Sequence, residues 1–231
     1  MGFMERFFTN PSSDDERNQL PMNSFATISH NELAAHLDVR SYGEFELTNA
    51  VRPAYDLKIS PQQGYRHDVY VDEENDTRVP VIMAAVSKKA LFSTFIQLVE
   101  KLGPVVDVVL ETSHDSEAGD HEDLYREHID TPVLVSLLWE FEDMLLNDGC
   151  TGIAVMNQGR PQEVQFDEHK LLIMYGSPLE QFEFTLEKNG VPCDEEIRFL
   201  SEAEHIHSTT NDYRSLFQEF CMRLGVEHEA V

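Results

Sequence analysis

Hydrophobic residues recur every three or four positions between residues 131 and 146. They are Leu134, Leu137, Leu138, Phe141, Met144 and Leu145. This spacing places them on one face of an α-helix. Thr131 can act as N-cap, and Pro132 fits the first helical position because its missing N–H would have no partner there. The pattern predicts a helix over residues 131–146 that buries Leu138 and Phe141.

A second stripe, begun by Ser87, predicts a helix between two apolar runs at residues 79–86 and 105–110. Its members are Leu91, Phe92, Phe95, Ile96, Val99 and Leu102, and Gly103 and Pro104 follow them. The flanking runs are rich in β-branched residues, which favours strands. Residues 79–111 are therefore expected to form a β-α-β unit, right-handed if its strands are parallel neighbours.

The chain after Gly149 alternates short apolar runs with turn residues. Residues 153–156 read as a central strand, residues 164–166 as a half-solvated strand, and residues 171–175 as another buried strand. Ser177 followed by Pro178 and Glu180 predicts a capping box for the next helix, which runs to Gly190. Ile197 and Phe199 suggest a strand that could reach residues 205–207.

The last helix is expected over residues 213–224 and ends before Gly225. Near the start, Ser29 and Glu32 form a capping box for a short helix, and residues 42–71 alternate as antiparallel strands do. We expect residues 1–28 to be a mobile arm and residues 29–231 a single domain. Within it, residues 29–78 can form a smaller β-rich lobe.

The order of these elements defines the fold class. It predicts an α+β (or α/β) protein with a mixed β-sheet and helices packed on it, built around the β-α-β unit and followed by α-β-β-α-β-α. Such an architecture implies no activity by itself.

Composition limits the setting of the protein. The 231 residues are 41% hydrophobic, enough for a sizeable core. No apolar run approaches the ~18 residues of a membrane span, and the first residues lack the pattern of a secretory signal. The three cysteines are an odd number without close pairs, which argues against a disulfide framework. A cytoplasmic location is expected, with no membrane association.

The net charge of −26 is the strongest compositional signal. Acids spread along the whole chain are typical of a solvated surface. Nucleic-acid binding is disfavoured, because phosphate contacts need clustered basic residues and the chain has 17 Lys and Arg against 43 Asp and Glu. A protein partner or a second copy of the chain is the expected partner.

Residues 111–130 hold the densest group of ligand-type side chains, with His114, Glu117 and His121 as candidate metal ligands. Glu117 and His121 have helical i, i+4 spacing, but Gly119 lies between them, and the H-E-x-x-H motif of zinc proteases is absent. We interpret this segment as a solvated acidic loop or helix edge.

His205 and His207 are two further candidate metal ligands. On a strand both would face the same way, so they could share a divalent ion with Asp194, Glu195 or Glu202. A surface strand that happens to carry two histidines is the simpler interpretation. A third polar group, residues 167–169, could hold an acid close to a base but fits a turn better.

No nucleophile or nucleotide-binding motif is present, and no cofactor is expected. We expect Cys150 and Cys221 to lie in apolar surroundings, while Asp194 should raise the pKa of Cys193. The leading hypothesis is a non-catalytic interaction or regulatory domain. The alternatives are a metal-assisted hydrolase that uses an acidic and histidine cluster, and a self-associating structural protein.

Overall fold

The computed structural model describes residues 24–72, 77–114 and 122–226. Its strands are β1 (Ser41–Tyr42), β2 (Phe45–Glu46), β3 (Val51–Pro53), β4 (Gly64–Asp72), β5 (Thr77–Ala85), β6 (Val105–Thr112), β7 (Glu122–Asp130), β8 (Thr151–Asn157), β9 (Glu163–Phe166), β10 (Leu171–Tyr175) and β11 (His205–His207). Its helices are α1 (His30–Leu37), α2 (Lys88–Val99), α3 (Thr131–Glu140), α4 (Glu142–Asn147), α5 (Glu180–Lys188) and α6 (Asn211–Leu224). Short 3-10 turns cover Glu100–Leu102 (η1) and Leu200–Glu202 (η2).

A seven-stranded sheet forms the centre of the described chain, in the order β4-β5-β10-β9-β8-β6-β7. The α+β class is confirmed, but every neighbouring pair in the sheet is antiparallel, so the expected mixed sheet is wrong. The strands of the predicted β-α-β unit, β5 and β6, both exist. Strands β10, β9 and β8 separate them, so they are not neighbours.

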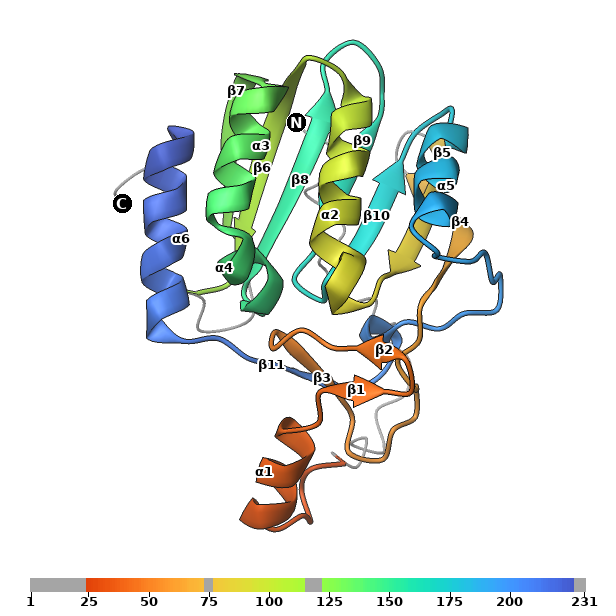
Figure 1. Cartoon of the computed structure of the whole chain (residues 1–231), viewed down its shortest axis with the longest axis vertical. Helices are drawn as coiled ribbons and strands as arrows, with labels where there is room; N and C mark the ends of the chain where they lie inside the picture. The colour runs from red at the N-terminus through yellow and green to blue at the C-terminus, as the bar shows by residue number, and fades with distance from the viewer. Residues whose placement is uncertain (1–23, 73–76, 115–121, 227–231) are drawn as a thin grey trace.

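Helices α2 to α6 all cover the same face of this sheet (Figure 1). Their apolar stripes and the inward side chains of the strands form one continuous core. The stripe of α2 is buried as predicted. Helix α6 buries Phe217, Phe220, Cys221 and Leu224 and ends at Gly225 in the left-handed conformation. Leu138 and Phe141 are also buried, which confirms the face assigned to residues 131–146.

The helix predicted over residues 131–146 is two helices. Phe141 leaves helical geometry, with φ −106° and ψ 16°, and separates α3 from α4. Asp130 rather than Thr131 occupies the N-cap position. The Thr131 hydroxyl instead donates to the carbonyl of Gly103, which ties the start of α3 to the end of η1.

The opposite face of the sheet is covered in part by residues 197–199. Ile197 and Phe199 pack on apolar side chains of β5 and β10. They do not form the predicted strand, which is confined to β11. All four residues of β9 are buried, so the expected half-solvated strand is wrong. Strand β9 has a partner strand on each side, and its polar side chains Glu163 and Gln165 are buried and hydrogen-bonded to each other.

Two other local predictions also fail. Helix α5 begins at Glu180 after Leu179 and has no side-chain cap, so the capping box at Ser177 is absent. Residues 122–130, interpreted as a loop or helix edge, form strand β7 at the edge of the sheet. Propensity is a local preference, and here pairing with β6 overrides it.

A small lobe lies below the sheet in Figure 1 and contains α1, β1, β2 and β3. The capping box of α1 is present, with Ser29 and Glu32 bonded reciprocally. The C-terminal part of the chain joins this lobe through β11, which pairs with β3 from His205↔Pro53 to His207↔Val51. This second sheet sets the position of the candidate site.

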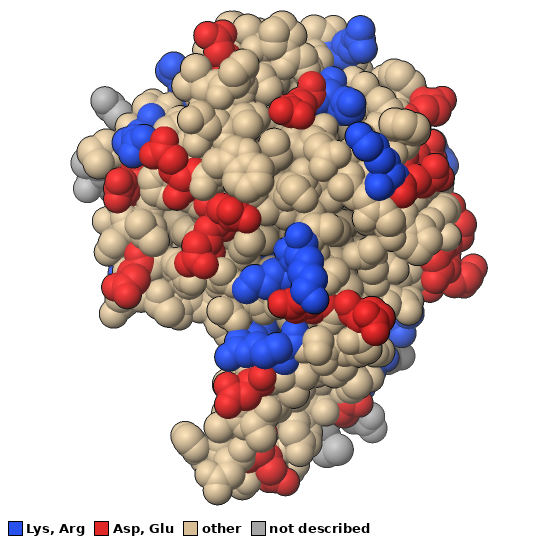
Figure 2. Space-filling view, viewed as in Figure 1, with Lys and Arg blue, Asp and Glu red and all other residues tan. Residues whose placement is uncertain are grey.

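Acidic and basic side chains are interspersed on the helix-covered face shown in Figure 2. The net charge of −26 is therefore not gathered into one acidic patch on that face. Among the described helices, none combines the length and hydropathy that a membrane crossing requires.

Candidate metal centre

The turn between β9 and β10 presents His169. Asp167 closes this turn, because its backbone N–H donates to Leu171 and its carboxylate accepts from the N–H of Leu171 at 2.7 Å. Lys170 adopts a left-handed conformation with φ 65°, which is uncommon for a side chain of this size. The second carboxylate oxygen of Asp167 lies 2.9 Å from Nδ1 of His169. The turn therefore fixes both the position and the rotation of the His169 ring.

Strand β11 supplies His205 and His207. Residues two apart on a strand project to the same side, and pairing with β3 holds this strand in register. Nδ1 of His205 lies 2.7 Å from the carbonyl oxygen of Ala203, and Nδ1 of His207 lies 2.6 Å from that of Gly149. Each ring is thus held through its Nδ1 atom.

The three imidazoles form a nearly equilateral cluster. Ring centroids are 4.8 Å apart for His169 and His205, 4.9 Å for His169 and His207, and 4.9 Å for His205 and His207. One nitrogen from each ring lies within 4.8 Å of the other two. All three residues are half-buried. We call His169, His205 and His207 the three-histidine cluster.

The hydrogen bonds at Nδ1 determine the tautomers. A carbonyl or carboxylate oxygen only accepts, so each Nδ1 carries the hydrogen that it donates. In the neutral ring Nε2 then keeps a lone pair, and no described group donates to these Nε2 atoms. A ring fixed through Nδ1–H with Nε2 free is the usual arrangement of a metal-binding histidine.

The surroundings favour neutral rings on β11. Burial lowers the pKa of His205 and of His207, and a charged His169 would lower both further. Burial also opposes charge on His169, but the Asp167 carboxylate outweighs it and raises the pKa of that ring. Asp167 consequently accepts the Nδ1–H hydrogen bond of His169. A carboxylate in this position makes the other ring nitrogen a more basic metal ligand.

The loop from Asn147 to Thr151 joins the cluster to the rest of the fold. Gly149 accepts from His207, and its N–H donates to Ser208 at 2.8 Å. A Cβ at Gly149 would lie 2.5 Å from the carbonyl oxygen of Ala50, so only glycine allows this approach of the small lobe. Asn147 accepts from the N–H of Asn49 in the same lobe.

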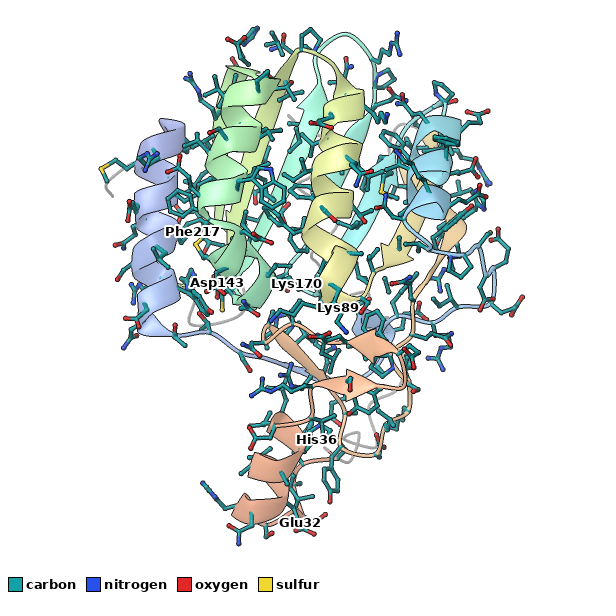
Figure 3. The ribbon with its side chains drawn as sticks, in the orientation of Figure 1. Glu32, His36, Lys89, Asp143, Lys170 and Phe217 are labelled. Carbon is teal, nitrogen blue, oxygen red and sulfur yellow. The ribbon has the colours of Figure 1, made fainter. Side chains whose placement is uncertain are left out.

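Buried polar residues surround this loop. Asp148 is fully buried and binds His114 at 2.8 Å and the hydroxyl of Thr151. The ammonium of Lys170 donates to the carbonyl of Thr151 at 2.8 Å, and burial lowers the pKa of Lys170 to about 8. Figure 3 shows Lys170 at the end of the sheet that faces the small lobe. Perturbed pKa values in a buried polar group are typical of functional sites.

A pocket opens beside His169 and Lys170. Its volume is about 40 Å³, which is room for roughly three water molecules. The pocket is lined by apolar side chains of the small lobe, such as Phe45 and Leu47, and by Phe199 from the segment 197–199. Water or a small group can therefore lie next to the three-histidine cluster.

The structure brings together only some of the residues singled out by sequence. His205 and His207 do share a site, but their third partner is His169. The acids expected to join them are elsewhere: Glu202 binds Arg66, and Glu195 binds His67.

The other candidate group is only partly covered by the structure. His114 pairs with Asp148, which sequence reasoning had not linked to it. Glu117 and His121 lie outside the described residues. Cys150 is not in the expected apolar surroundings, because it lies with His114 and Asp148 in one group of ligand-type side chains. Cys221 is buried among apolar residues, as predicted.

His169 was assigned to a turn, and that assignment is correct. What sequence reasoning missed is that this turn faces β11, 36 positions away along the chain. The available signal was an Asp-x-His sequence beside a buried strand, a spacing that lets the carboxylate orient the imidazole.

Comparisons with known proteins give no assignment. The chain matches no family model, no curated protein and no solved structure. Function must therefore be argued from the site itself.

Proposed function

We propose that this protein binds a divalent transition metal, with zinc as the best fit, through Nε2 of His169, His205 and His207. The observation that supports this is the joint arrangement of three rings, each held through Nδ1–H, with one nitrogen of each ring within 4.8 Å of the others in one half-buried cluster. Imidazole nitrogens are common zinc ligands, and zinc accepts the low coordination number that three rings supply.

Three protein ligands leave a fourth position for water. This is the ligand count of catalytic zinc sites, whereas structural sites are closed by four protein ligands. A zinc ion held there would supply a water of lowered pKa, which is a nucleophile at neutral pH. We therefore favour the metal-assisted hydrolase over the interaction domain, and the nearby pocket gives water access to the three-histidine cluster.

The residues of this chain have distinct parts in the proposal. Asp167 orients His169, while the carbonyls of Ala203 and Gly149 orient the other two rings. Lys170 lines the pocket, and its buried ammonium, which donates to the carbonyl of Thr151, would favour a substrate with a negatively charged or polarised oxygen. The interaction-domain and self-association hypotheses remain predictions that no observed feature favours.

The first test is metal stoichiometry by calorimetry, with zinc added to metal-free full-length protein at physiological salt. We expect His205→Ala to lose one equivalent of micromolar or tighter binding, since two imidazoles seldom hold zinc that tightly. His128→Ala is the matched control, because that ring is 70% exposed on β7 and outside the cluster. An unchanged stoichiometry and affinity in His205→Ala would refute the site.

The second test is catalysis. Zinc-loaded protein should hydrolyse an activated ester or phosphate ester, and His205→Ala should lose this activity while His128→Ala keeps it. Zinc binding without hydrolysis in the wild-type protein would leave the metal site standing and would reject the hydrolase.

A further inference from the structure

A second group of side chains that could bind a metal lies at the lateral edge of the sheet formed by strand β4. Residues 192–194 run parallel to this strand. The N–H of Tyr65 donates to Pro192 at 2.9 Å, and the N–H of Asp194 donates to Tyr65 at 2.8 Å. With Cys193 paired to Tyr65, a step of two residues along each segment places Glu195 beside His67. Backbone hydrogen bonds thus set the spacing of this group before any side-chain contact forms.

The side chains of His67 and Cys193 both contact the same carboxylate oxygen of Glu195. Nδ1 of His67 lies 2.6 Å from Oε1 of Glu195, and the thiol of Cys193 donates to the same oxygen at 3.3 Å. On the other side of the ring, Nε2 lies 2.6 Å from a carboxylate oxygen of Glu183 on α5. Ligand atoms of His67, Cys193 and Glu195 all lie within 4.8 Å of one another.

We propose that Cys193, His67 and Glu195 form a surface site for a thiophilic divalent cation of the zinc class. His67 would bind through Nδ1, and Glu183 would hold the ring through Nε2 as an outer carboxylate. Thiolate, imidazole and carboxylate are the three zinc ligands found in proteins, and a carboxylate behind the histidine is their usual support.

The metal-free state shows what the cation would replace. Both ring nitrogens of His67 donate to carboxylate oxygens, of Glu195 and of Glu183, so the ring bridges the two as an imidazolium, and these hydrogen bonds raise its pKa. Burial and Glu195 raise the pKa of Cys193, which keeps its proton. Binding exchanges one divalent cation for two protons, one from Nδ1 of His67 and one from the thiol. The net charge of the site formed by His67, Cys193 and the two carboxylates is therefore the same with and without the bound cation.

This site is distinct from the three-histidine cluster in both place and chemistry. It draws on β4, α5 and the segment after α5, and it contains sulfur, which the cluster lacks. All three ligand residues are exposed, so an ion reaches them directly from solvent. Three ligands again leave a coordination position open, here for water or for a group from another molecule.

Cobalt(II) separates the two sites, because a thiolate bound to cobalt gives a charge-transfer band in the near ultraviolet and imidazole does not. We expect metal-free full-length protein titrated with cobalt to develop this band to an intensity that corresponds to one thiolate-bound cobalt per chain, whether or not a second cobalt occupies the three-histidine cluster. Cys193→Ser and His67→Ala should lose it, and His205→Ala should keep it. Retention in His205→Ala makes the result independent of the proposed zinc centre.

Cys150→Ser is the matched thiol control, since Cys150 also lies near a histidine and an acid but in another part of the fold. It should keep the full band. Three outcomes would overturn the proposal: no band in the wild-type protein, a band that survives Cys193→Ser, or a band lost in Cys150→Ser. The far-ultraviolet circular dichroism of each variant checks that it has folded.

Discussion

The helix-covered face of the sheet and the end of the sheet next to the small lobe use opposite kinds of buried side chain. On the first, Phe95, Leu134 and Leu138 are fully enclosed by other apolar groups. At the second, Asp148, Asp167 and Lys170 are enclosed almost as completely. Apolar burial stabilises the fold directly, whereas a buried charge costs desolvation even when it is paired.

This difference separates two duties of one sheet. The apolar face stabilises the folded state. The polar end lowers that stability, because charged groups held in fixed buried positions lose their hydration. A chain selected only for stability would gain by replacing such groups with apolar ones. The presence of three histidines, two buried acids and a buried lysine at one end is the pattern expected of a functional site.

The largest expected effect tests the apolar side of this comparison. Leu138→Ala removes a fully buried side chain and should lower the free energy of unfolding by about 2 to 5 kcal/mol. Zinc affinity of the folded protein should not change, because Leu138 touches none of the proposed ligands. Urea denaturation and zinc calorimetry on the same variant measure the two quantities. A large loss of zinc affinity would show that the two regions are coupled.

A smaller effect concerns Glu111, which is buried on the face of β6 away from the helices. Burial and then the nearby Asp123 raise its pKa to about 9. The folded chain therefore keeps a proton on Glu111 that the unfolded chain releases above about pH 4.5. Stability from this group is full below that pH and is lost as the pH rises toward 9.

Glu111→Gln removes this titration and should stabilise the protein at pH 8 relative to pH 5. The interval from pH 5 to pH 8 lies within the shift of the Glu111 pKa from 4.5 to about 9, and each pH unit there is worth up to about 1.4 kcal/mol, so we expect a relative gain of about 2 to 4 kcal/mol. Urea denaturation at both pH values measures it. Glu127→Gln, with its side chain 80% exposed on β7, is the control and should show no such gain. The same stability change at both pH values in Glu111→Gln would contradict the assignment.

The smallest effect tests the polar end. Asp167→Asn keeps the size of the side chain but removes the charge behind His169, so zinc affinity should fall at least about tenfold, or about 1.4 kcal/mol. The stoichiometry should stay the same, because all three imidazoles remain. Asp56→Asn, at an exposed ion pair with Lys58, is the matched control. Unchanged affinity in Asp167→Asn would mean that the carboxylate serves only the turn.

Much of the fold is readable from local patterns, and the site is not. The stripes of α2 and α6 and the capping box of α1 follow from spacing alone, because helix contacts are local. The break at Phe141 and the placement of β10 between β5 and β9 depend on pairing between distant segments. No periodicity in the sequence encodes that pairing.

The three-histidine cluster shows the same limit. The pair His205 and His207 and the Asp167–His169 turn were each visible as separate groups, and each had a plain interpretation. The two groups come together only because β11 pairs with β3 and the β9–β10 turn faces that pair. Ligands brought together by tertiary contacts leave no motif, since motif spacing records only local geometry.

The pairing of β3 with β11 has a consequence for kinetics. A sheet of two short strands is marginal by itself, so this pair is expected to open more readily than the seven-stranded sheet. His205 and His207 would move away from His169 in each opening. The residence time of a bound metal would then be set by the opening rate of this pair, and metal binding would in turn slow amide hydrogen exchange of β3 and β11.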